Sequence, residues 1–304
     1  MSSSNRVLLN RVDARATNDG DGVKIHRVGG QALNQVLDPF LMIDEINSDD
    51  SADYIGGFPE HPHRGFETIT YMKAGRMRHR DHMGNEGLIS AGGVQWMTAG
   101  RGVMHSEMPE QESGLLQGFQ LWLNLPAASK MKPAAYCDLQ SSDIAEVNLS
   151  EGGQVRAIAG EIEVNGKAVS GSVPGLSDPL STQAVMLDVT LSPGEHLNLG
   201  FKAENPAWVY VYDGSVYDGS VPDSSVPDSS LRLEAGGEIQ RRQMGVFSQG
   251  AILQLQGGAV GARALVLSGR PLKEPIVQYG PFVMNSSAEI EQAFEDYRSN
   301  RLAI

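Results

Sequence analysis

Short runs in which apolar and polar residues alternate recur along the chain, and they are separated by Gly, Pro and Asp. A period of two is typical of β-strands that bury one face. The clearest runs are 40–43, 68–72, 119–123, 186–191 and 264–267. Glycine-rich turns such as Ala91-Gly92-Gly93 lie between them. The pattern predicts an all-β protein with β-sandwich or small-barrel architecture.

One segment near the C-terminus has a helical pattern instead. Ser286, followed three residues later by Glu289, is arranged as a capping box. The apolar residues after it fall on one helical face: Ile290, Ala293, Phe294 and Tyr297. We therefore predict a short C-terminal helix in an otherwise β-rich chain.

The chain is predicted to form two halves of similar length. Residues 126–152 are polar, carry two prolines and are predicted to connect them. We place the domains at 1–135 and 136–304. Inside the second, residues 211–230 consist of four pentads of the form V-[YP]-D-[GS]-S. Turn formers with little apolar surface predict a solvated loop here, although one Asp per pentad also allows an acidic cation-binding loop.

Composition narrows the class of protein. The 304 residues are 40% hydrophobic and 20% charged, as in a folded globular protein. Acidic residues outnumber basic ones by 37 to 24, and the net charge of −13 disfavours direct binding to nucleic acid. No apolar run approaches the roughly 18–20 residues of a membrane span. A single cysteine, Cys137, and an N-terminus without the apolar core of a secretory signal predict a cytoplasmic protein.

Five of the seven histidines lie between residues 61 and 105. His61 and His63 are two apart, so on a strand both imidazoles point the same way. His105 and Glu107 repeat this spacing with an imidazole and a carboxylate. Two such pairs on neighbouring strands would supply three nitrogens and one oxygen, which suit Fe(II), Mn, Ni, Cu or Zn. Four protein ligands would leave about two positions of a six-coordinate ion open.

Other interpretations of these histidines stay open. An isolated H-x-H is usually a pair of surface or hydrogen-bonded histidines, and the second pair shifts the balance towards a metal. His79 and His82 are three apart, and we expect both to be solvated, with orientation of a ligand or substrate as the alternative. His196 has no such companion and is expected to be structural or exposed.

Several longer motifs resemble the pirin family of the cupin superfamily. They are H-P-H-R-G-F-E-T at 61–68, Q-W-M-T-A-G-R-G at 95–102, H-S-E-M-P at 105–109 and G-P-F-V-M-N at 280–285. The resemblance implies two jelly-roll-like cupin barrels in tandem, with a metal in the N-terminal barrel only. The resemblance implies that the family's metal ligands, three His and one Glu, correspond to His61, His63, His105 and Glu107 in this sequence. Glu67, a ligand in many cupins, is then a structural or supporting group.

The resemblance also implies a function. Pirin-like proteins are similar in site to quercetin 2,3-dioxygenases, so we expect a flavonol and O2 as substrates, ring opening, and release of carbon monoxide. The expected cofactor is one divalent transition metal, with Fe(II) favoured, and Glu107 is the candidate catalytic base. Apolar residues near the motifs, Trp96 and Trp122 among them, could line a pocket, but most are expected in the barrel core.

Other functions stay open. The main alternative is a metal- or redox-dependent regulatory protein that binds a transcription factor or a metabolic enzyme, and a cupin with a vestigial metal is the third. The resemblance favours a monomer.

Overall fold

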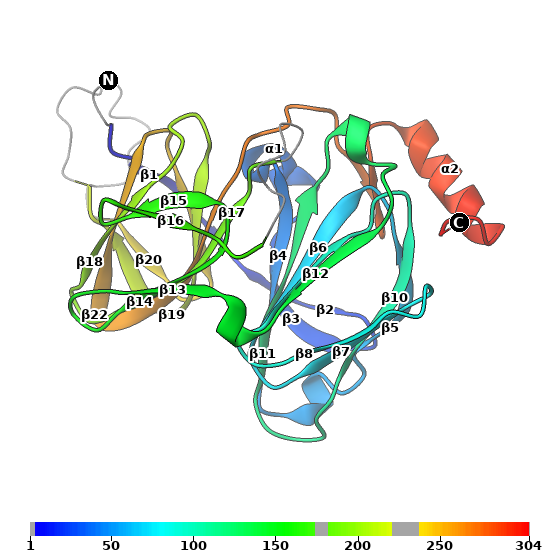
Figure 1. The fold of residues 1–304 in the computed structure, drawn as a ribbon, viewed down its shortest axis with the longest axis horizontal. Coiled ribbons are helices and arrows are strands. Elements are labelled where there is room, and N and C mark those ends of the chain that lie inside the picture. Colours follow the sequence, from blue (N-terminus) through cyan, green and yellow to red (C-terminus); the bar gives the residue numbers. More distant parts are fainter. Residues whose placement is uncertain (1–3, 174–181, 221–236, 304) are drawn as a thin grey trace. The chain divides into compact units, whose positions relative to one another are not determined.

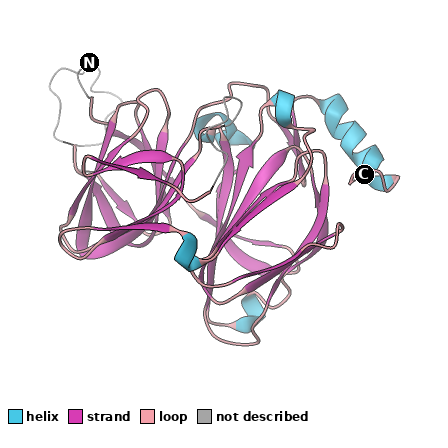
Figure 2. Cartoon of the chain, viewed as in Figure 1, coloured by secondary structure: helices cyan, strands magenta, loops and turns pink. Residues whose placement is uncertain are grey.

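The computed structural model describes residues 4–173, 182–220 and 237–303. Its contacts divide the described residues into two compact units. The first unit is built mainly from residues 15–143 and 272–303, and the second from 4–14, 144–173, 183–220 and 237–271. Strands dominate both units (Figures 1 and 2), which confirms the predicted all-β class. Among the described residues, no helix is both long and apolar enough to cross a bilayer.

The first unit contains a seven-stranded and a four-stranded antiparallel sheet. The larger sheet has the order β12-β9-β6-β11-β4-β3-β2, and the smaller has the order β5-β10-β7-β8. The strands of the larger sheet are β2 (Arg15–Asp19), β3 (Val23–Gly29), β4 (Phe40–Ser48), β6 (Phe66–Ala74), β9 (Val94–Thr98), β11 (Leu116–Asn124) and β12 (Ala135–Leu139). Those of the smaller sheet are β5 (Phe58–His63), β7 (Met77–Asp81), β8 (Glu86–Ile89) and β10 (Val103–Pro109). The short α1 (Asn34–Leu37) precedes β4.

Side chains of the two sheets meet in the interior of the first unit. Buried apolar residues such as Ile25, Ile46, Met72 and Met77 form a core cluster that joins strands of both sheets. Polar side chains also cross the interior, since Thr70 on β6 donates a hydrogen bond to Glu107 on β10. This interior is where the predicted site residues lie.

The second unit is built on one eleven-stranded antiparallel sheet. Its main path is β1-β21-β19-β22-β17-β14-β13, and β15, β16, β18 and β20 pair beside it. The strands are β1 (Leu8–Asp13), β13 (Ala145–Asn148), β14 (Gln154–Ala159), β15 (Glu161–Val164), β16 (Lys167–Ser170), β17 (Val185–Leu191), β18 (His196–Gly200), β19 (Ala207–Asp218), β20 (Glu238–Gln240), β21 (Gln243–Phe247) and β22 (Ile252–Ser268). Its core is a large aliphatic cluster that includes Leu187, Val209, Leu255 and Val266.

Both ends of the chain depart from the predicted division at 135/136. Strand β1 pairs with β21 and so belongs to the second unit. Residues 272–303 belong to the first unit and form β23 (Val277–Tyr279), β24 (Phe282–Met284) and α2 (Ser287–Arg298). The predicted connector is largely structured, because β12 pairs with β9 and β13 pairs with β14.

The predicted C-terminal helix is present. The Ser286 hydroxyl oxygen accepts the Glu289 N–H at 3.3 Å, and the Glu289 carboxylate accepts the Ser286 hydroxyl at 2.9 Å. Ile290 and Ala293 pack against Phe282, Met284 and Leu302, as expected for the apolar face. Tyr297 differs from the prediction because 40% of it is exposed.

The solvated-loop prediction for the pentad repeat is wrong for its first two pentads. Residues 211–218 form part of β19, and Val211, Tyr212 and Val216 are buried. These apolar side chains join the core, while register shifts in the pairing with β22 and a φ of +64° at Gly214 accommodate the turn formers. The later pentads, 221–230, lie outside the described residues.

Candidate metal centre

Three histidines converge in the interior of the first unit. Strands β5 and β10 are antiparallel neighbours, with His105 directly opposite His61 and Val103 opposite His63. Because side chains two apart share a face, His61, His63 and His105 meet. The centroids of their rings are 4.4–4.9 Å apart. One ring nitrogen from each lies within 4.8 Å of those of the other two.

The hydrogen bonds of the outer nitrogens fix the ring tautomers. Nδ1 of His61 lies 2.8 Å from the Pro59 carbonyl oxygen, and Nδ1 of His63 lies 3.4 Å from that of Pro281. A carbonyl only accepts, so each Nδ1 carries a hydrogen, and in a neutral ring the Nε2 atom then carries the lone pair. These two Nε2 atoms face each other at 3.0 Å.

This donor set fits a cation. Burial lowers the pKa of His63 and of His105 well below the usual value, and the neighbouring histidines act in the same direction. Neutral imidazoles with converging lone pairs repel one another unless a positive ion or a proton lies between them. Within the described residues, neither ring nitrogen of the buried His105 has a hydrogen-bond partner. A divalent transition ion would satisfy these nitrogens.

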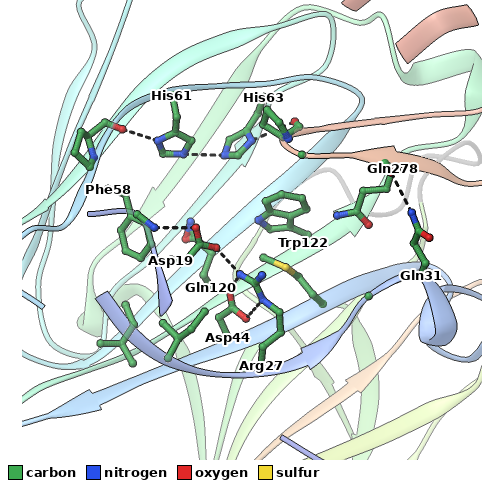
Figure 3. A pocket seen from close by; sticks show the side chains of 18 residues that line it. Asp19, Arg27, Gln31, Asp44, Phe58, His61, His63, Gln120, Trp122 and Gln278 are labelled. Carbon is green, nitrogen blue, oxygen red and sulfur yellow. Dashed lines mark hydrogen bonds and ion pairs between the residues drawn. The ribbon is translucent and has the colours of Figure 1, made fainter. Parts of the chain in front are cut away.

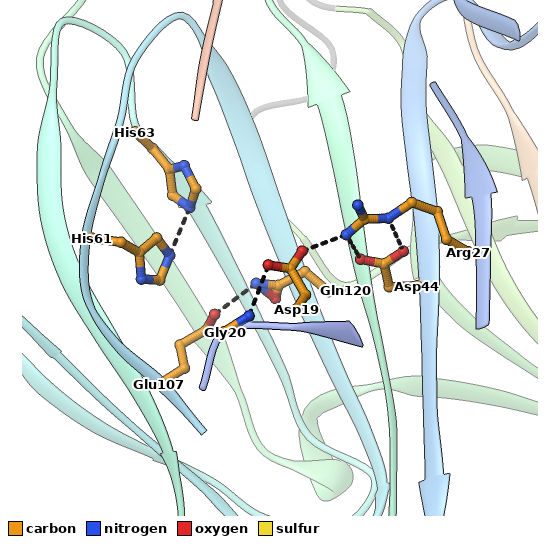
Figure 4. A network of polar contacts seen from close by, with 8 residues as sticks. All are labelled: Asp19, Gly20, Arg27, Asp44, His61, His63, Glu107 and Gln120. Atoms are coloured by element: carbon orange, nitrogen blue, oxygen red, sulfur yellow. Dashed lines mark hydrogen bonds and ion pairs between the residues drawn. The ribbon is translucent and has the colours of Figure 1, made fainter. Parts of the chain in front are cut away.

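Glu107 lies two residues after His105 on β10 and is held by two donors. The Thr70 hydroxyl donates to its Oε1 at 2.7 Å, and Nε2 of Gln120 donates to its Oε2 at 2.6 Å. Glu107 is buried, with 2% of its surface exposed. Its carboxylate is not in the close group formed by the histidine nitrogens. The structure thus brings the three predicted imidazoles together. Figure 4 shows two of them, His61 and His63, and the Glu107 carboxylate held by Gln120.

A fourth histidine, His79, also lies at this site. On β7 it is directly opposite Glu107, and its ring centroid is 5.2 Å from that of His105. Burial lowers its pKa, while the charges of Glu107 and Asp81 act in the opposite direction. The expectation that His79 is solvated is wrong, because only 1% of it is exposed. His82 and His196, in contrast, are exposed as expected.

A cavity of about 730 Å³ opens beside the histidines. His61 and His63 line one end, Arg27 and Asp44 line the other, and Trp122 lies between (Figure 3). Met42 and Phe58 add apolar wall. Trp96 does not line this cavity but donates from its indole nitrogen to Glu67 at 2.9 Å.

A row of polar side chains, three of which line the cavity, follows one register across the larger sheet. Arg27, Asp44, Gln120 and Thr70 stand directly opposite one another on the adjacent strands β3, β4, β11 and β6. Through Gln120 and Thr70 this row reaches Glu107 on the other sheet. The row links the far end of the cavity to the histidine end.

Two buried cations hold the C-terminal segment against the residues that follow His63. Arg64 pairs with Asp296 on α2 at 2.8 Å and donates to the Leu302 carbonyl at 3.2 Å. The Lys130 ammonium donates to the carbonyl oxygens of Gly65 and Val283 at 2.7 and 2.9 Å. The same segment carries the Pro281 carbonyl that orients His63.

Comparison with known families agrees with this architecture. The Pirin family model matches residues 22–123, and the model of the Pirin C-terminal cupin domain matches residues 186–303. The chain belongs to the pirin family. Its two units are tandem cupin domains, as the motifs had predicted.

Relatives of this pirin share nearly its whole length. It is 44% identical to a protein of Pseudomonas aeruginosa named "Putative quercetin 2,3-dioxygenase", which covers 98% of this chain and 99% of that protein. A protein of the same name from Vibrio cholerae is 42% identical and covers 98% of each chain. The crystal structure of a quercetin 2,3-dioxygenase from Acinetobacter baumannii matches with a TM-score of 0.83 and 31% identity, over 98% of this chain and 99% of that one.

The hydrogen bonds of Glu67 agree with a structural role in this pirin. Glu67, expected to be a supporting group, accepts hydrogen bonds from Trp96 and from the Thr98 hydroxyl at 2.6 Å, and so ties β6 to β9. It is not in the histidine group. Arg27 and Asp44 were not singled out from the sequence, because they become neighbours only when β3 pairs with β4.

Proposed function

We propose that this pirin is a metal-dependent dioxygenase that opens the heterocycle of a flavonol such as quercetin. The observation that carries the proposal is the convergence of three histidine ring nitrogens, two of them from His61 and His63, which line one end of a cavity. The cavity volume of about 730 Å³ lies within the roughly 300–1,000 Å³ typical of sites for ligands with several rings. Relatives named for quercetin 2,3-dioxygenation give further support.

The proposed cofactor is one divalent transition ion bound by His61, His63, His105 and Glu107. Imidazole and carboxylate donors suit Fe(II), our expected ion, and also Mn, Ni, Cu or Zn. Each Glu107 oxygen has acceptor capacity beyond the hydrogen bond from Thr70 or Gln120. Glu107 can therefore bind the ion or take up a proton while these donors keep it oriented.

In the proposed reaction, both atoms of O2 enter the product and the flavonol carbon that bears the 3-hydroxyl leaves as carbon monoxide. When bound, the ion supplies Lewis acidity that lowers the pKa of the 3-hydroxyl. Glu107 accepts the hydroxyl proton on a carboxylate oxygen. Gln120 and Thr70 hold that carboxylate in place, and Trp122 provides a flat wall for the substrate rings.

The test is reconstitution of the full chain without oxygen. The metal-free protein is loaded separately with Fe(II), Mn, Ni, Cu and Zn, mixed with quercetin, and exposed to O2. Loss of quercetin absorbance and release of carbon monoxide are measured together, and at least one form should show both. If every fully loaded form leaves quercetin intact, the proposed function is wrong.

Two variants separate the role of Glu107 from a general effect of removing a carboxylate. Glu107→Gln keeps the size of the side chain but removes the base, so turnover should fall at least a hundredfold. Glu112→Gln removes a carboxylate from an exposed residue and should leave turnover unchanged. Retained turnover in Glu107→Gln would exclude Glu107 as the base. The regulatory alternative, the monomeric state and the cytoplasmic location stay predictions.

A further inference from the structure

The end of the cavity far from the histidines carries a charged group that the proposed oxygen chemistry does not use. We call it the Arg27 cluster: Arg27, Asp44 and Asp19. Asp44 accepts two hydrogen bonds from the Arg27 guanidinium, at 2.7 Å from Nε and 2.6 Å from Nη2. Asp19, the last residue of β2, accepts a third from Nη2 at 2.5 Å. All three residues line the cavity (Figure 3), and Figure 4 shows the contacts among them.

The members of the cluster differ in what they offer to the cavity. The side chain of Asp44 is 6% exposed, and both its oxygens bind Arg27, so it positions the guanidinium. Arg27 and Asp19 are 31% and 46% exposed. Among the described residues, no hydrogen bond occupies Nη1 of Arg27. Nη1 therefore has two N–H donors for a ligand, and the Asp19 carboxylate has acceptor capacity left.

Removing the charged groups of this cluster from water costs free energy. The interior around it is lined by Ile25, Met42 and Ile46, and charged groups are expensive to bury among apolar side chains. A simple structural pair would need only Arg27 and Asp44. Asp19 adds a second carboxylate on the cavity side and leaves the cluster with one net negative charge.

The charge and the donors select a chemical class. A carboxylate on a ligand would accept from Arg27 but would be repelled by Asp19. A hydroxyl group both donates and accepts, so ring hydroxyls can donate to Asp19 while they accept from Nη1 of Arg27. Trp122, between the cluster and the histidines, favours a flat ligand that reaches both ends.

We propose that Arg27 and Asp19 are specificity-determining residues that bind the outer-ring hydroxyl groups of the substrate, with Asp44 as the positioning residue. This inference rests on the proposed function, since it assumes that the flavonol enol lies at the histidine end. It assigns the substrate class: neutral, flat and polyhydroxylated, as opposed to the bare ring system or an acid.

The test measures binding, so it does not depend on turnover. Zn-loaded full-length protein is titrated by calorimetry with quercetin, which has hydroxyls on both outer rings, and with 3-hydroxyflavone, which has none. Quercetin should bind at least about tenfold more tightly, as expected for hydrogen bonds to charged groups. Arg27→Met and Asp19→Asn should each remove most of that preference and leave binding of 3-hydroxyflavone within about twofold of wild type.

Asp19→Asn guards against a folding defect, because it leaves the buried Arg27–Asp44 pair intact. Arg80→Met, which changes an exposed arginine paired with Glu86 outside the cavity, is the matched control and should keep the full preference. The proposal is overturned if quercetin and 3-hydroxyflavone bind wild type equally, if neither binds, or if the variants lose affinity for both alike. Tighter binding of a carboxyl-substituted 3-hydroxyflavone than of quercetin would overturn it too.

This result and that of the proposed function can be told apart. A clear preference for quercetin that depends on Arg27 and Asp19, in a protein that consumes no flavonol with any metal, would refute the oxygenation and keep the binding assignment. Turnover of quercetin and 3-hydroxyflavone with equal kcat/KM would do the reverse.

Discussion

Gly65 lies between β5, which carries two histidines, and β6. It packs against β24 in the C-terminal segment that completes the first unit. It follows His63 and Arg64 and has a φ of +90°, where side chains are disfavoured. A Cβ atom at this position would lie 2.0 Å from the Val283 carbonyl oxygen on β24. Gly65→Ala therefore imposes backbone strain and also forces β24 to move.

The expected loss of stability can be estimated from these contacts. Placing alanine at a positive φ costs about 1–2 kcal/mol. Moving β24 weakens the hydrogen bond from Val283 N–H to the Arg64 carbonyl, at 3.1 Å, and that from Lys130 to the Val283 carbonyl, at 2.9 Å. At about 1 kcal/mol each, the total loss in the free energy of unfolding is about 3–4 kcal/mol.

Gly114→Ala is the matched control. Gly114 has a φ of +91°, and an added Cβ would meet nothing within 4 Å, so only the backbone strain of about 1–2 kcal/mol applies. Urea unfolding of both variants measures the difference. Zn titration of the folded proteins should show about tenfold weaker binding in Gly65→Ala alone, because the Pro281 carbonyl that orients His63 moves with β24. Equal stability and equal Zn affinity in the two variants would refute the reasoning.

Three further outcomes follow from the site. Gln120→Leu removes a donor to Glu107, so kcat should fall about tenfold or more; in a Glu107→Gln background the same change should have little effect. Burial lowers the pKa of Lys130 from 10.5 to about 7. Between pH 7 and 10.5 the lysine is therefore protonated in the unfolded chain and mostly neutral in the folded protein. The free energy of unfolding should therefore rise from pH 7 to 10, by at most about 1.4 kcal/mol per pH unit. The midpoint of urea unfolding should rise less over this range in Lys130→Met than in wild type. A free Zn concentration of about 100 times the Kd should raise the free energy of unfolding of wild type by about 2.7 kcal/mol. Scanning calorimetry should detect the corresponding rise in Tm in wild type and not in His105→Ala.

Spacing along the chain predicted the parts of the site that depend on single strands. His61 with His63, and His105 with Glu107, point inward because a strand alternates its faces, and β5 and β10 are neighbours as expected. The same alternation also indicates that His79 is buried. On β7, Met77 and His79 share the buried face, and Arg78 and Arg80 occupy the other.

Features made by distant strands could not be predicted in this way. Arg27 meets Asp44, and Asp44 meets Gln120, only through the pairing of β3, β4 and β11. Nothing local in the sequence indicates that residues 272–303 complete the first unit, because their partners are more than a hundred residues earlier. In the pentads, local turn propensity was outweighed by the burial of apolar side chains such as Val216 in the core.

Residues 272–303 belong to the first unit although they are made after the second, and this affects the order of events during synthesis. His61, His63 and His105 leave the ribosome early, whereas the Pro281 carbonyl that sets the tautomer of His63 is made after almost all of the second unit. A nascent chain therefore carries the three imidazoles long before their arrangement is complete. We therefore expect the orientation of His63 seen here to be reached only after residues 272–303 have been made.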